Sequence, residues 1–542
     1  MVHCYIFGEG GSGLRVLLAI YMILSSIAYG KTGVDEGWKM FAQVMDLGAA
    51  EISKLRKLLE ADKVINFRAP HCSFTLLRLA EKVKIWLQKA DKNGNGKMTA
   101  GNAAPDWFRE ELILTREQLE RDITGGYYGD LVLGSMISPI AMECARETEE
   151  DKNSGFQAIA EDVAASNNTY EVRVAFVGSG WGGEGRQNLC IRPALLRRLC
   201  VSWVTEKLQL QPEQAEEYVE RNLKIAVVMF GNAFHFPVEE SLSQNTAGLV
   251  AGTLRNYPAA AAEAVNLFYL LEHDCSPVQA EEPLAYGDQK KHAHAIELVA
   301  VAAVDNFFRR DTITQKQCPV IPHYSLPGRQ QTNWDNLGLP GEYRRALSAR
   351  LRFDAALFYW VRPQLLVSDD ERNAGKLYES EILGRMYQAK TPEKVEEAVE
   401  ASGLDLDRDI IQPLKALIMK ETAFLEYLRD ISLTGKNWKT GAEPPAGCGA
   451  DLFEVSRIEH MLNFGDIRDY GGMREFQLDE LTVCPKSKEN MYHTKLTMSK
   501  VRDRVKYRSG GRPAAFSEIL GEIYEICSDE RRRKTWHFWN AN

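Results

Sequence analysis

Two glycine-rich stretches are the parts of this sequence whose residue types and spacing best fit chemistry. The first, GEGGSG, places Gly8, Gly10 and Gly13 in the spacing G-x-G-x-x-G, between the apolar runs VHCYIF and LRVLLAI. The second, GSGWGGEG at residues 178–185, follows the apolar run EVRVAF. Glycines at a strand-to-helix turn let backbone N–H groups approach an anion, and the helix N-terminus adds partial positive charge. Both stretches therefore predict a phosphate-binding turn, with a tight turn that binds nothing as the alternative.

The spacing after the first stretch departs from that of a dinucleotide-binding Rossmann unit. Such a unit places an acidic residue at the end of the next strand, about 20 residues further on. Here the next run that alternates like a strand, VKIWLQKA, is followed by Asp91. A second glycine cluster in mid-domain instead favours a fold that encloses phosphates from two sides. The P-loop motif G-x-x-x-x-G-K-[ST] is absent from the sequence. A Rossmann-type enzyme that binds NAD or FAD remains the alternative.

The runs that position these loops alternate between strand-like and helical patterns. The strand-like runs are almost wholly apolar, which is typical of a parallel sheet that is covered on both faces. We therefore predict an α/β domain, a mainly parallel sheet with helices on both faces, over residues 1–312. Helical patterns dominate the rest, so we predict a mostly α-helical accessory domain over residues 313–542.

Three local expectations accompany this fold. The apolar run at residues 14–29 predicts a helix buried against the sheet, with a signal or anchor segment as the alternative. Apolar residues recur at helical spacing over residues 38–61, which predicts a helix there. A further helix is expected from about Pro193 to Leu208.

In the order and character of these elements, residues 1–312 resemble the tubulin/FtsZ superfamily, in particular its divergent bacterial tubulin-like members. GEGGSG and GSGWGGEG resemble the family's two glycine loops, and KADKNGNG resembles the loop that closes over the phosphates. The run IAVVMFGNAFHFP resembles the strand and bend that follow the second loop. The resemblance implies a domain that binds GTP or GDP, with or without Mg²⁺. The helical C-terminal region does not resemble the family's second domain.

The glycine pattern and the resemblance together give one candidate nucleotide site. Its members lie in the two glycine loops, at the start of the helix after the second loop, and in the loop at residues 91–95. They are Gly8, Gly10, Gly11, Ser12, Gly13, Asp91, Asn93, Asn95, Gly178, Gly180, Gly182, Gly183, Gly185 and Asn188. No metal ligands of the protein's own are predicted. For the loop at 91–95, an EF-hand-like calcium loop and a plain solvent loop are the alternatives, although position twelve of an EF-hand would be Asn102 instead of Glu.

Two features of the sequence bear on catalysis. Glu184 lies inside the second loop, where a carboxylate beside a phosphate requires a metal ion or a base such as Arg186. The resemblance implies that hydrolysis needs acids in an N-x-D-x-x-D-like run after the central helix, donated to a neighbouring subunit. This chain reads VDNFFRRDTITQ there, so Asp305 and Asp311 are the nearby acids but the spacing differs. Catalytic residues therefore remain unassigned, and hydrolysis is expected to be slow or absent.

Composition narrows the partners and the compartment. The chain has 542 residues and a net charge of −9, which argues against non-specific nucleic-acid binding. Its 10 cysteines form no C-x-x-C pair, which indicates thiols in a reducing compartment. We expect a cytoplasmic protein that binds a nucleotide and no membrane; self-association and a protein partner of the helical region are left open. An interaction module that has lost its nucleotide is a third hypothesis.

Overall fold

The structure is a computed structural model of the whole chain, and it describes the greater part of the predicted α/β and helical regions. The described residues are 2–28, 38–43, 50–65, 73–76, 115, 155–231, 246–255, 257–273, 293–313, 323–326, 332–366, 377–432, 450–463, 496–505 and 515–528.

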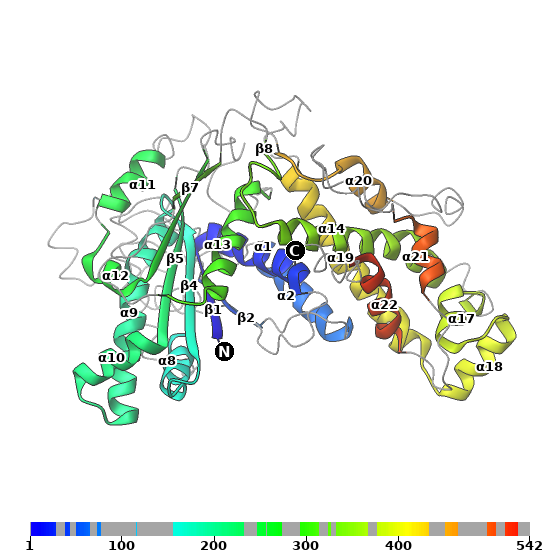
Figure 1. The fold of residues 1–542 in the computed structure, drawn as a ribbon, viewed down its shortest axis with the longest axis horizontal. Helices are drawn as coiled ribbons and strands as arrows, with labels where there is room; N and C mark the ends of the chain where they lie inside the picture. The colour runs from blue at the N-terminus through cyan, green and yellow to red at the C-terminus, as the bar shows by residue number, and fades with distance from the viewer. Residues whose placement is uncertain are drawn as a thin grey trace, which may run out of the picture.

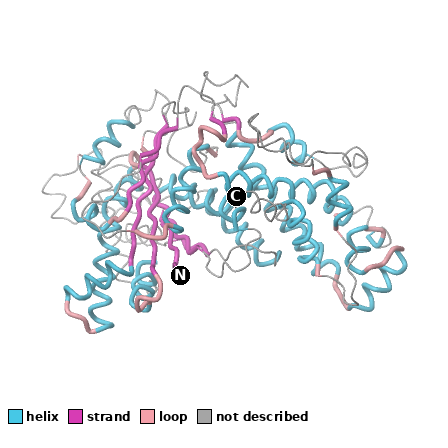
Figure 2. The backbone as a smooth tube through the Cα atoms, in the orientation of Figure 1, coloured by secondary structure: helices cyan, strands magenta, loops and turns pink. Residues whose placement is uncertain are grey.

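A parallel sheet of seven strands forms the first half of the molecule, in the order β3-β2-β1-β4-β5-β6-β7 (Figures 1 and 2). Every neighbouring pair in this sheet is parallel. The strands are β1 (Val2–Glu9), β2 (Trp38–Gln43), β3 (Ser73–Leu76), β4 (Glu171–Ser179), β5 (Leu223–Phe230), β6 (Leu267–His273) and β7 (His323–Leu326). The predicted α/β architecture is confirmed. The domain boundary at residue 312 stays a prediction, and β7 follows it in the chain.

Helices cover both faces of this sheet, as near-continuous apolar strands require. One face carries α8 (Gly155–Ala165), α9 (Gly183–Leu208), α10 (Pro212–Asn222), α11 (Thr246–Arg255) and α12 (Ala259–Ala264). The other face carries α1 (Gly10–Ala28), α2 (Ala50–Ile65) and α13 (Ala295–Arg309), which lie between the sheet and the helical region in Figure 1. Each face has its own hydrophobic core.

The apolar run near the N-terminus forms α1, and the prediction of a buried helix there is confirmed. Its residues from Leu14 to Leu24 are all buried. Among the described residues, no helix has the length and apolarity needed to span a membrane.

The described part of the remaining chain is mostly helical, as predicted. Its helices are α14 (Gly341–Ala356), η2 (Leu357–Val361), α15 (Arg362–Leu365), α17 (Glu381–Tyr387), α18 (Pro392–Ser402), η4 (Asp407–Ile411), α19 (Gln412–Ser432), α20 (Val455–Asn463), α21 (Met498–Arg504) and α22 (Phe516–Ser528). Two short strands, β8 (Thr332–Asn333) and β9 (Ala450–Asp451), pair in parallel. The core around α1 and α13 continues into these helices, so the two regions share one hydrophobic interior.

Two of the local predictions are only partly right, since residues 50–61 are helical in α2 and α9 ends at Leu208 as expected, but the beginnings of both predicted helices are wrong. The start of the expected helix at 38–61 is strand β2, because these residues pair in parallel with β1 from Cys4↔Trp38 to Glu9↔Gln43. The helix expected to begin near Pro193 begins ten residues earlier, at Gly183, and Pro193 lies inside it. Because glycine has low intrinsic helix propensity, the glycine-rich residues at the start of α9 do not look helical in the sequence, although they are helical in the structure.

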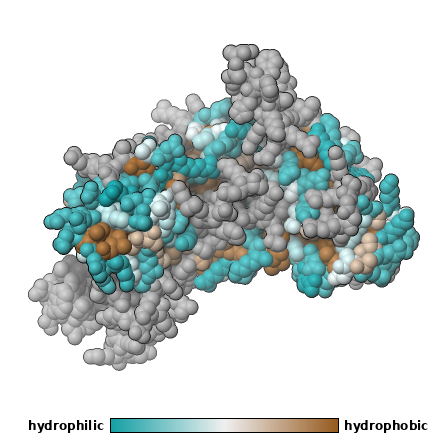
Figure 3. All heavy atoms as spheres, turned by 60° about the horizontal axis from the view of Figure 1, so that its bottom comes forward, coloured by the Kyte–Doolittle hydropathy of each residue, from teal (hydrophilic) through white to brown (hydrophobic). Residues whose placement is uncertain are grey.

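Hydrophilic side chains make up most of the coloured surface on the face shown in Figure 3. Hydrophobic side chains form separate patches among them on that face.

Candidate functional site at the ends of β1 and β4

The structure brings the two glycine loops together at one edge of the sheet. β1 and β4 are neighbours, with Gly8 opposite Val177 and Glu9 opposite Gly178. The chain leaves β1 toward β2 on one side and leaves β4 toward β5 on the other. In open α/β sheets, ligands bind in the crevice outside the carboxyl ends of the strands at such a reversal.

The outer glycines of the first loop allow a close approach of backbones. A Cβ built on Gly13 would overlap the carbonyl oxygen of Val177 and lie 2.6 Å from the carbonyl carbon of Gly8. A Cβ on Gly8 would in turn lie 2.8 Å from the backbone of Gly13. These two glycines therefore let α1 pack directly on the β1–β4 pair, and their predicted part in nucleotide binding stays a prediction.

Several glycines of the second loop pack against the first loop. Cβ atoms built on Gly178 and Gly185 would lie 3.0 Å and 2.9 Å from the carbonyl oxygen of Glu9. A Cβ on Gly180 would meet the flexible side chain of Met229, with its Sδ at 2.6 Å. The glycines at 178 and 185 therefore leave room for the backbone of the first glycine loop.

The helices α1 and α9 both begin at this edge, and α9 begins without a side-chain cap. α1 begins at Gly10, which has a φ of 66° in the left-handed region. Gly182 is the N-cap of α9 and supplies no side-chain capping bond. Gly11, Ser12 and Gly182 are half-buried, so they lie at the open side of the loops. Uncapped N–H groups of a helix N-terminus form an anion-binding site.

A buried ion pair beneath the loops holds them together. The carboxylate of Glu9, at the end of β1, is fully buried and accepts from Arg192 Nη1 at 2.5 Å and from Asn188 Nδ2 at 3.0 Å. Burial raises the pKa of Glu9, while Arg192 and Asn188 oppose that rise. The Arg192 guanidinium also lies over the rings of Phe7 and Phe156. The predicted site residue Asn188 thus directs its side chain at Glu9.

Arg186 lies one turn into α9 and is 4% exposed. Its backbone N–H donates to the Gly182 carbonyl oxygen at 3.0 Å, and its Nε has no hydrogen-bond partner in the part of the chain that the structure describes. Burial lowers the pKa of this guanidinium. The second loop therefore has a buried cation beside it.

The other predicted residues are distributed as follows. Asp91, Asn93 and Asn95 lie outside the described residues. Gly183 is the first residue of α9 and follows the N-cap residue Gly182.

Asp305 serves a structural contact. It is buried on α13, accepts from Tyr343 Oη of α14 at 2.6 Å, and pairs with Arg309 Nε at 2.8 Å. Burial raises its pKa. Asp311 is exposed just after α13.

Sequence reasoning missed the ion pair of Glu9 and Arg192. The available signal was the position of Glu9, a charged residue between the glycines of a strand-to-helix turn. Asn188 and Arg192 follow the second loop at i, i+4 spacing, which places both on one helix face.

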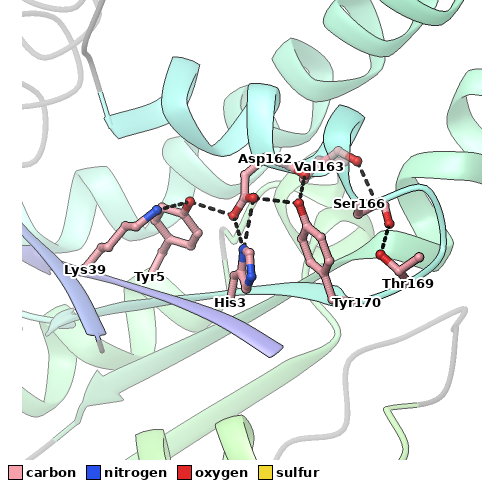
Figure 4. Close-up of polar contacts among 8 residues, drawn as sticks. All are labelled: His3, Tyr5, Lys39, Asp162, Val163, Ser166, Thr169 and Tyr170. Atoms are coloured by element: carbon pink, nitrogen blue, oxygen red, sulfur yellow. Dashed lines mark hydrogen bonds and ion pairs between the residues drawn. The ribbon is translucent and has the colours of Figure 1, made fainter. Parts of the chain in front are cut away.

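A second polar cluster lies at the opposite, amino-terminal edge of the sheet (Figure 4). Asp162 of α8 accepts from three donors, His3 Nδ1 at 2.8 Å, Tyr5 Oη at 2.7 Å and Tyr170 Oη at 2.9 Å. Lys39 Nζ donates to Tyr5 Oη at 3.0 Å, and the His3 ring stacks on Tyr170 with centroids 4.0 Å apart. This cluster fastens α8 to the start of β1 and β4.

Comparison with known proteins finds no relative of this chain. No family model matches it, and neither a curated protein nor a solved structure is significantly similar.

Proposed function

We propose that this chain is a tubulin-like protein that binds a guanine nucleotide, GTP or GDP, with its phosphates at the adjoining N-termini of α1 and α9. The observation that supports this most is the meeting of two glycine loops, distant in sequence, where the strand order reverses. The guanine base and the tubulin/FtsZ relationship rest on the resemblance of the motifs. On this proposal the protein acts in the cytoplasm.

One observation favours a second candidate, a dinucleotide-binding enzyme. The order 3-2-1-4-5-6 that begins at β3 is also that of the Rossmann fold, which binds NAD or FAD at the same crevice. That fold uses its last motif glycine for close helix–strand packing, as Gly13 does here. Strand β2 ends at Gln43, where a Rossmann enzyme has an acid at or just after the strand end.

The substitution Gly182→Val tests the phosphate site. Gly182 has a φ of −73°, which valine adopts, and in the described part of the chain an added Cβ would meet the side chain of Ser179, whose Oγ at 2.7 Å accepts from Gly182 N–H and would have to rotate away. We expect the variant to fold and to lose at least about tenfold in affinity for GTP, because branched carbons would stand where the loop backbone approaches a phosphate.

Thermal shift with GTP, GDP, ATP, NAD and FAD is the measurement. Ligand at 100 times its dissociation constant stabilises by about 2.7 kcal/mol. Stabilisation by NAD or FAD alone would support the second candidate, and no shift with any ligand would support a module without a nucleotide. Equal GTP binding by parent and variant would contradict phosphate binding by this loop.

We expect hydrolysis of bound GTP to be slow or absent. Asp305 is held by Tyr343 and Arg309, so it is not free to position a water, and losing one such group commonly costs on the order of 100- to 1000-fold in rate. The measurement is phosphate release at increasing protein concentration. Turnover of several per minute that rises with concentration would contradict this and would show that a second copy completes the site. Loss of that activity in Asp311→Ala would then identify the acid.

A further inference from the structure

Arg186 differs from the other buried arginines around the sheet. Arg15 Nε donates to Glu297 at 3.0 Å, and Arg192 pairs with Glu9. Arg173 Nη2 pairs with Glu171 at 2.7 Å. Among the residues whose side chains the structure describes, Arg186 has no carboxylate partner, and a guanidinium keeps its proton at any physiological pH. A buried charge without a counter-charge costs several kcal/mol, so this position favours an anion supplied from outside the chain.

The guanidinium lies between α9 and α11, beside the second glycine loop. A Cβ built on Gly252 of α11 would lie 3.4 Å from Arg186 Nη2, so the side chain reaches that helix. The next residue of α11, Thr253, donates from Oγ1 to the carbonyl oxygen of Gly180 at 2.8 Å. The loop, the first turn of α9 and α11 thus surround one buried cation.

The helix itself adds to the positive potential there. α9 has 26 residues and its N-cap, Gly182, gives it no side-chain cap. A helix terminus alone would bind an anion weakly, because its effect is confined to the first turn. Arg186 lies at the end of that turn and adds a full positive charge, so an anionic ligand is favoured more strongly there than by the helix terminus alone.

We propose that Arg186 binds a phosphate group of the ligand, so that this contact favours nucleoside di- and triphosphates over the uncharged nucleoside. This inference rests on the proposed nucleotide function and assigns the selective contact to one side chain. Without ligand, the buried positive charge of Arg186 destabilises the folded protein. In the complex, the negative charge of the phosphate compensates that positive charge.

The experiment compares Arg186→Gln with Arg198→Gln, which removes an exposed arginine from the same helix. Binding of GTP, GDP, guanosine and inorganic pyrophosphate is measured by calorimetry. We expect Arg186→Gln to weaken GTP and pyrophosphate about 10- to 100-fold, Arg198→Gln to change neither, and guanosine to bind both alike. Arg186→Lys should recover part of the loss, because it restores the charge without the planar donors.

The melting temperature without ligand separates recognition from a structural role. We expect Arg186→Gln to melt at a higher temperature than the parent, since it removes an uncompensated buried charge; a lower one would show a structural arginine and overturn the proposal. Equal GTP affinity in Arg186→Gln and parent would also overturn it while leaving the nucleotide function intact. Pyrophosphate binding that needs Arg186, without nucleotide binding, would support the anion site and contradict the nucleotide function. A parent that binds neither contradicts both.

Discussion

Replacing Gly13 by alanine is expected to destabilise the protein by about 4 kcal/mol or more, the range of the most damaging single substitutions. The added methyl would overlap the carbonyl oxygen of Val177 and lie 2.6 Å from the carbonyl carbon of Gly8. Both groups belong to strands that are held in a parallel ladder, so neither moves without breaking pairing between β1 and β4. Urea unfolding measures the change.

Gly521→Ala is the matched control for this prediction. Gly521 lies inside α22, and a Cβ there would have none of the described atoms within 4 Å. Replacing Gly521 by alanine should raise the free energy of unfolding by up to about 1 kcal/mol, because alanine is a better helix former than glycine. Equal unfolding midpoints for Gly13→Ala and the parent would show that α1 does not pack on the strands as the structure has it.

The second large effect concerns pH and the buried Asp354 of α14. Asp354 is fully buried, and neither of its carboxylate oxygens accepts a hydrogen bond within the described part of the chain. Burial, followed by the charge of Glu421, raises its pKa well above the ordinary value, while Arg350 and Lys420 oppose the rise. Arg350 is itself bonded to Glu421, with Nε to Oε2 at 2.8 Å. Asp62 of α2 faces the same cluster through its ion pair with Lys420.

The sign of the pH effect follows from linkage. A carboxyl with a raised pKa binds its proton more tightly in the folded state, so stability falls as pH rises from the ordinary pKa toward the raised one. Within that window the loss is about 1.4 kcal/mol per pH unit. We expect Asp354→Asn, which has no proton to lose, to be less sensitive than the parent to a change from pH 5 to pH 7.

Urea unfolding at pH 5 and pH 7 gives the change in the free energy of unfolding with pH for each variant. Other buried acids with raised pKa, such as Glu9 and Glu297, contribute to parent and variant alike, so the difference between the slopes reports on Asp354 together with the Glu421 carboxylate that interacts with it. Asp409→Asn is the control, because Arg408 lowers the pKa of this half-buried acid, and it is ionised above pH 5 in both the folded and the unfolded state. Identical slopes for Asp354→Asn and the parent would contradict the assignment.

The sequence alone determined the parallel sheet and the location of the candidate site. Runs such as those of β4 and β5 are almost wholly apolar, and only a sheet covered on both faces buries such strands. Dense glycine after β1 and β4 required close backbone approach there. These signals are local, so they can be recognised without knowing what packs against them.

Tertiary structure decided what each of those residues does. Trp38–Gln43 fits either a helix or a strand by pattern, and its pairing with β1 makes it a strand. The glycines at 13 and 185 became packing positions because a backbone lies against each one. Glu9 and Arg192 are 183 residues apart, whereas Arg186 of the same helix has no carboxylate partner among the side chains that the structure describes. Which charges are paired depends on strand register and helix packing between distant segments, and no local pattern encodes that.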